Sequence, residues 1–243
     1  MLQISTFSLV GDWESASEYS DRYITRFSDD AGALAQRSLM EYELGNPGQG
    51  QHYLERYLQA IQTAMDFHAI IHINFINLTY QVTGQEHLEE TRARAQVMLS
   101  PSQNYPALQA VARFALGRLA VHSGDRPQAS EHYEYLLPHR GSVLWHVDGV
   151  VDRLLGLLSQ TMGNSDQATA HFEDALALCR KAGYRPELAW TCCDYADMLK
   201  ERDVDGDRAR AIALLDESLA ISSELGMRPL MERVLSRRDI LKA

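Results

Sequence analysis

The chain has 243 residues, of which 45% are hydrophobic and 23% charged, and this composition predicts a folded chain with a substantial core rather than disorder. Its 23 basic and 33 acidic residues give a formal net charge of -10, so its overall field repels phosphate backbones and disfavours direct binding of nucleic acid. The longest apolar stretches fall far short of the roughly 20 residues that a membrane span needs, and residues 1–10 lack the features of a signal peptide. Three cysteines, two of them adjacent, do not suggest disulfides, and we expect a cytoplasmic protein.

A glycine followed by a residue that can cap a helix recurs six times along the chain. The pairs are Gly11-Asp12, Gly45-Asn46, Gly84-Gln85, Gly124-Asp125, Gly163-Asn164 and Gly206-Asp207. By subtraction, the intervals run from 34 residues (11 to 45) to 43 residues (163 to 206). Such a glycine can end one helix with a positive φ, and the residue after it can cap the next helix. The pattern therefore predicts six helix-turn-helix units.

The units follow one another in chain order as pairs of helices. We expect them at about residues 1–28, 30–64, 66–100, 105–138, 143–183 and 185–226, followed by a capping helix at 228–242. Apolar residues between the glycines follow a helical period, without the alternation typical of strands. Small residues, Gly117 and Gly156, precede two of the turns by seven positions, where they allow helices to approach closely. These patterns predict an all-α chain that forms a single domain over residues 1–243.

Several of these motifs resemble those of the tetratricopeptide repeat. Leucine-glycine, then glycine with Asn or Asp, then alanine and an aromatic residue match it best over residues 116–133 and 155–175. Residues 184–227 are similar to the last full repeat of LuxR/MalT-type ATP-dependent regulators and of AAA-linked nucleotide cyclases. The resemblance implies a right-handed α-solenoid of about six helix pairs in a bacterial signalling protein. The sequence has neither the phosphate-binding GxxxxGK[ST] loop nor the basic helix-turn-helix segment of those proteins, so we expect an excised domain or a stand-alone relative.

Motifs that would indicate catalysis or a bound metal are missing from the sequence. It contains no HExxH, CxxC, GxSxG or GxGxxG, and we expect neither enzymatic activity nor a cofactor. His68 and His72 have a spacing that can place two imidazoles on one metal, but a structural role is the favoured interpretation because no third ligand is evident. Cys192 and Cys193 point about 100° apart on a helix, which favours core packing over a shared metal.

In a solenoid of this kind, the binding groove lies on the concave face and is lined mainly by the first helix of each pair. The register of the turns places ten residues on or near this face: Tyr42, His72, Asn74, Phe114, Arg118, His146, Arg153, Trp190, Asp194 and Asp197. Arg118 and Arg153 can bind a partner's carboxylate or phosphate. An equally good alternative pairs them with Asp148, Asp152 or Asp194 inside the stack. Trp145 and Trp190 can anchor a ligand, but core packing is the default for large aromatic residues.

Three functions agree with these features. The first is a non-enzymatic scaffold that binds a peptide or a partner domain in the groove. The second, implied by the resemblance to MalT-type regulators, is a domain that senses a small-molecule effector in an enclosed cavity near Asn74, Phe114 and Arg153. The third is self-association through the end helices.

Overall fold

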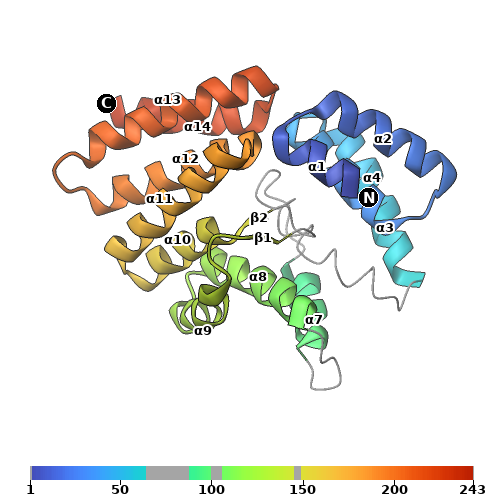
Figure 1. The fold of residues 1–243 in the computed structure, drawn as a ribbon, viewed down its shortest axis with the longest axis horizontal. Helices are drawn as coiled ribbons and strands as arrows, with labels where there is room; N and C mark the ends of the chain where they lie inside the picture. Colours follow the sequence, from blue (N-terminus) through green and yellow to red (C-terminus); the bar gives the residue numbers. More distant parts are fainter. Residues whose placement is uncertain (1, 64–87, 100–105, 145–148, 243) are drawn as a thin grey trace.

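The computed structural model describes residues 2–63, 88–99, 106–144 and 149–242, and these residues are almost entirely α-helical (Figure 1). The helices are α1 (Leu2–Val10), α2 (Trp13–Arg26), α3 (Ala31–Glu43), α4 (Pro47–Thr63), α7 (Leu88–Met98), α8 (Pro106–Ser123), α9 (Arg126–Leu136), α10 (Val151–Met162), α11 (Ser165–Ala182), α12 (Arg185–Arg202), α13 (Asp207–Leu225) and α14 (Arg228–Lys242). The predicted all-α class is confirmed. None of the helices in these ranges combines the length and apolar character needed to cross a bilayer.

The predicted turns lie where the glycines placed them. Gly11, Gly45, Gly124, Gly163 and Gly206 all have positive φ, between 63° and 87°, a conformation that costs glycine little. Gly84 lies outside the described residues.

The residues after these glycines cap the next helix in only some of the turns. The carboxylate of Asp12 accepts a hydrogen bond from Ser15 N, and that of Asp125 accepts one from Gln128 N. Asn164 forms no side-chain cap, and Asp207 is the first residue of α13 and pairs with Arg202 instead. The turn prediction is thus confirmed more widely than the cap prediction.

Close packing of paired helices depends on small residues at the predicted positions. A Cβ atom at Gly156 on α10 would come within 3.1 Å of the ring of Phe172 on α11, closer than ordinary van der Waals contact, so a larger residue there would require this ring to shift. The four alanines that follow the turns, Ala16, Ala129, Ala168 and Ala211, are all fully buried. Three apolar cores result, one among α1–α4, one among α7–α10 and one among α10–α14.

The fifth unit begins differently from the prediction, which had a helix from residue 143. A 3₁₀ turn, η1 (Leu137–His139), is followed by two short antiparallel strands, β1 (Val143–Leu144) and β2 (Gly149–Val150), and α10 begins only at Val151. Val143 pairs with Val150, and Leu144 with Gly149. A Cβ atom at residue 149 would lie 2.7 Å from the Phe114 ring, so the close approach of this strand to α8 requires glycine.

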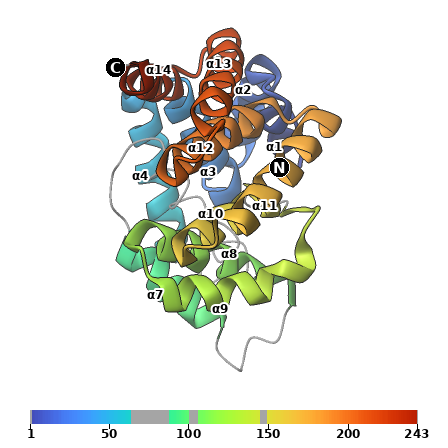
Figure 2. The same cartoon turned by 90° about the vertical axis from the view of Figure 1, so that its left-hand side faces the viewer.

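Helices from the two ends of the chain are in contact, which the prediction of successive repeats did not anticipate. Figures 1 and 2 show α1–α4 beside α12–α14, although these segments lie at opposite ends of the sequence. Trp13 Nε1 donates a hydrogen bond to Leu225 O at 3.0 Å, and Arg228 Nε donates to Leu44 O at 2.7 Å. The capping helix α14 therefore packs on α13 and also contacts α3.

Candidate functional site

A buried ionic cluster lies on the inner side of α10 and α12. The guanidinium of Arg153, only 1% exposed, donates from Nε and Nη2 to Asp194 Oδ2 at 2.9 and 2.7 Å. Its Nη1 donates to Glu187 Oε2 at 2.9 Å, and Glu187 Oε1 accepts the backbone N–H of Val150 at 3.2 Å. A buried arginine is tolerated because both carboxylates compensate its charge with good hydrogen-bond geometry.

The charges in this cluster stabilise one another against the effect of burial. Burial alone would lower the pKa of Arg153, but Asp194 and Glu187 outweigh it and raise that pKa above its ordinary value. Burial would likewise raise the pKa of Asp194, yet Arg153 and Arg233 lower it below its ordinary value. Arg118, half-buried on α8, belongs to the same electrostatic group: burial and the like charge of Arg153 lower its pKa to about 10. Arg153, Asp194 and Arg118 are therefore charged at neutral pH.

Trp190 on α12 connects this cluster to the N-terminal helices. Its indole Nε1 donates to both carboxylate oxygens of Glu43, the last residue of α3, at 3.0 and 3.2 Å. The guanidinium carbons of Arg153 and Arg233 lie 5.7 and 5.4 Å from the centroid of the indole ring, within the range of cation–π attraction.

Glu43 is the unusual group of the site. Burial raises its pKa to about 7, although the indole hydrogen bond and the charge of Arg153 act in the opposite direction. The carboxylate forms no ion pair with any other described residue within 4 Å. It is therefore partly protonated at neutral pH and has lone pairs left for a ligand that donates hydrogen bonds.

A cavity of about 60 Å³ lies between the N-terminal helices and α12. One wall comes from α1, α2 and α3 and the other from α10 and α12. Its lining residues are Ser8, Leu9, Trp13, Gln36, Leu39, Met40, Glu43, Arg153, Pro186, Glu187 and Trp190. The volume is roughly four times the ~15 Å³ that a water molecule needs, so the cavity can accept a small chemical group. Apolar walls with a few polar groups are typical of small-molecule sites.

A second set of ion pairs continues along α12 toward α14. Arg237 Nε lies 2.7 Å from Asp197, and Arg233 lies 3.7 Å from Asp194 and 3.8 Å from Asp197. Burial raises the pKa of Asp197, and its hydrogen bond with Arg237 opposes that shift. The basic face of the last helix thus meets the acidic face of α12 in a partly buried contact.

The structure brings together some of the residues predicted for the groove and separates others from it. Arg153, Trp190 and Asp194 form the centre of the site, Arg118 acts on it electrostatically, and Asp197 lies at its α14 edge.

Two of the predicted groove residues belong instead to the apolar cores. Tyr42 is 3% exposed, lies against Gly50 and hydrogen-bonds to Gln51, and Phe114 is 1% exposed in the α7–α10 core. Both are core residues because they point to the second helix of their own pair or to β2 rather than to the inner face.

The structure also describes two of the predicted ion-pair partners of Arg153 and the three cysteines. Of the two internal pairings considered for Arg153 that the structure describes, Asp194 is correct and Asp152 is wrong, because Asp152 contacts Gly141 and His171. The predicted residues His68, His72, Asn74, Trp145, His146 and Asp148 lie outside the described residues. The three cysteines are fully buried in the core, as expected.

Glu187, Glu43 and Trp13 are site residues that the sequence reasoning missed. Glu187 could have been found, because residues 187, 190, 194 and 197 fall on one face of a helix and the last three were selected. Glu43 could not, since its partner Trp190 is 147 residues away in the chain and only the closure of the fold unites them.

Comparison of the sequence with models of known protein families, and with curated proteins, gives no match. The resemblance to tetratricopeptide repeats and to MalT-type regulators therefore stays a prediction that rests on the motifs described above.

Proposed function

We propose that this chain is a non-enzymatic, tetratricopeptide-like binding domain of a bacterial signalling or transcriptional regulator, and that it senses a small-molecule effector. The cavity between α1–α3 and α12 supports this proposal best. Two indole side chains, Trp13 and Trp190, line it together with the carboxylate of Glu43. A ligand there would contact α1–α3 and α12 at once, so its binding would favour the arrangement in which these helices are in contact.

The charges of the cavity favour an effector with an amine or another cationic group. Arg153 is already compensated by Asp194 and Glu187, whereas Glu43 has only the indole N–H as a partner among the described residues. An ammonium group beside Glu43 would compensate its charge and stabilise the ionised carboxylate. The cavity volume limits the inserted part of the ligand to a few non-hydrogen atoms.

The alternative of a peptide or partner domain in the concave groove has weaker support. Recognition by Arg153 would require its guanidinium to face a partner, but the side chain is 1% exposed and bonds to Asp194. A partner would have to break these bonds, at a cost of several kcal/mol, before it could use this arginine. We therefore favour the effector proposal over the scaffold.

A thermal-shift screen of amines, amino acids and polyamines, with anionic metabolites as a comparison set, tests the proposal. The matched variants are Glu43→Gln, which keeps an acceptor for the indole, and Glu14→Gln, which changes an exposed glutamate on the neighbouring helix α2. We expect a cationic compound to raise the melting temperature of the unchanged protein and of Glu14→Gln, and to lose this effect in Glu43→Gln.

Calorimetry supplies a second readout. At pH 7 a carboxyl with a pKa near 7 is half protonated, so binding of a cation should release about half a proton per site. Titrations in two buffers with different ionisation enthalpies measure this number. Equal binding by the unchanged protein and by Glu43→Gln, or no stabilising compound in the screen, would contradict the proposal.

A further inference from the structure

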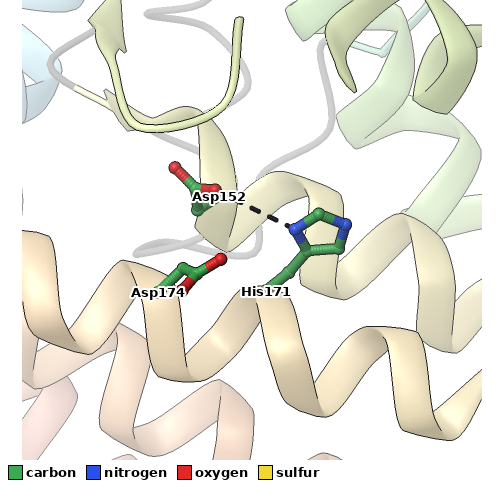
Figure 3. Close-up of side chains that lie close together, drawn as sticks. All are labelled: Asp152, His171 and Asp174. Carbon is green, nitrogen blue, oxygen red and sulfur yellow. Dashed lines mark ion pairs between the residues drawn. The ribbon is translucent and has the colours of Figure 1, made fainter. Parts of the chain in front are cut away.

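Three potential metal ligands meet where the start of α10 packs on the middle of α11, apart from the cavity (Figure 3). Asp152 lies in the first turn of α10, and His171 and Asp174 lie three positions apart on one face of α11. One ligand atom from each residue lies within 4.8 Å of the other two. Figure 3 shows the three side chains turned toward a common point.

Asp152 presents one oxygen to a backbone N–H and the other toward His171. Asp152 is 1% exposed, and its Oδ2 accepts a hydrogen bond from the backbone N–H of Gly141 at 2.6 Å. Its Oδ1 lies 3.9 Å from His171 Nδ1, too far for a hydrogen bond. A buried carboxylate attracts a cation, because burial of a charge without compensation is costly.

His171 presents a buried nitrogen that has no hydrogen-bond partner among the described residues. The residue is 7% exposed, its Nε2 lies 2.8 Å from the hydroxyl of Tyr133, and its Nδ1 is the unpartnered atom. When Nε2 carries the proton and donates to the Tyr133 oxygen, the Nδ1 lone pair points toward Asp152. A metal-ligating histidine is held in this way, with the second ring nitrogen donating to an oxygen acceptor.

We propose that Asp152, His171 and Asp174 bind a divalent transition-metal ion of the Zn²⁺ class. One imidazole and two carboxylates suit such an ion better than Mg²⁺ or Ca²⁺, which prefer oxygen ligands alone. Ligands at about 2.1 Å in tetrahedral geometry lie about 3.4 Å apart, so the present 3.9 Å between Nδ1 and Oδ1 needs a small contraction. Asp174 is exposed and can turn inward, and the solvent side leaves a coordination position for water.

The spacing of these ligands matches none of the short sequence motifs for metal sites. The motifs HExxH and CxxC place ligands within one short segment, whereas Asp152 precedes His171 by 19 residues (171 minus 152) and belongs to another helix. The ion would join the start of α10 to α11 and stabilise the turn at Gly141 through Asp152.

The test is a titration of the full chain, first freed of metal by a chelator, with Zn²⁺ and separately with Mg²⁺. Calorimetry gives the affinity, and the melting temperature gives the stabilisation. Asp174→Asn alters an exposed ligand without disturbing the core, and Asp166→Asn on the same helix is the matched control. We expect saturable Zn²⁺ binding that weakens at least tenfold in Asp174→Asn, is lost in His171→Gln and is unchanged in Asp166→Asn.

Two further readouts separate a built site from zinc held by surface histidines. Co²⁺ in place of Zn²⁺ should give a visible absorption spectrum typical of four-coordinate cobalt, which disappears in Asp174→Asn. Tyr133→Phe removes the acceptor for Nε2–H and should weaken binding about ten- to hundredfold. Absence of saturable Zn²⁺ binding up to about 1 mM, or equal affinity in Asp174→Asn and the unchanged protein, would overturn the proposal and leave Asp152 and His171 as a simple ion pair.

Discussion

Replacing Arg153 by methionine tests whether the buried ionic cluster holds the inner face together. Methionine keeps much of the aliphatic volume but removes all three charge-assisted bonds to Asp194 and Glu187. The two carboxylates would then be buried beside each other, with Arg233 at 3.7 Å from Asp194 and Arg118 on α8 as nearby cations. The variant thus isolates the compensation of charge from the filling of space.

The expected loss of stability is large. Removing one partner of a buried ion pair costs about 3–5 kcal/mol, because the other partner is left without compensation. Arg233 retains part of the compensation for Asp194, so we expect about 3 kcal/mol for Arg153→Met. For a chain of this size, that free energy lowers the melting temperature by roughly 6–12 °C.

Urea unfolding, followed by circular dichroism at pH 7, measures the free energy of unfolding. The comparison is a triple variant, Arg153→Met with Glu187→Gln and Asp194→Asn, in which the two carboxylates are neutral as well. This variant should recover part of the loss, because no uncompensated charge is left. A loss below about 1 kcal/mol in the single variant, or a triple variant less stable than the single one, would refute the reasoning.

Three other predictions follow from burial. The carboxyl of Glu43 has a pKa raised from 4.5 to about 7, so the protonated carboxyl contributes stability that is complete below about pH 4.5 and is lost as the pH rises through 7. In urea unfolding, the stability of Glu43→Gln relative to the unchanged protein should therefore increase by on the order of 2 kcal/mol between pH 5 and pH 8, and a constant difference would contradict this. Burial raises the pKa of all three cysteine thiols, so a thiol reagent should label them only on unfolding, and rapid labelling of the native protein at pH 8 would disprove their burial. Phe172→Ala should cost about 3–5 kcal/mol because the ring is fully buried and stacks on Tyr195 at 5.2 Å, whereas the exposed Phe27 should tolerate the same change at under about 1 kcal/mol; equal costs would show that the core assignment is wrong.

The local features of the fold could be predicted because they depend on neighbouring residues. Glycine at a helix end has a positive φ that costs little, so Gly163 and Gly206 indicated turns without any knowledge of the partners. Prolines at the starts of α4, α8 and α12 agree with the same logic, since the first turn of a helix has no N–H partner to lose. The start of α10 was predicted wrongly because the β1–β2 pair depends on contact with Phe114 on another helix.

The same distinction between local patterns and distant contacts applies to the candidate site. Three of its members, Trp190, Asp194 and Asp197, follow from the helical period alone, since that period decides which residues share a face. Their roles do not follow from it: Arg153 is satisfied internally, Trp190 bonds to Glu43, and Asp197 bonds to α14. Local sequence patterns determine the helices, the turns and the all-α class, because these depend on interactions over a few residues. The contact of α1–α3 with α12–α14 and the cavity that it creates depend on how small angles between successive helix pairs add up, and short-range patterns do not encode that sum. The meeting of Asp152 with His171 depends on the packing of α10 on α11, which joins residues from two helices.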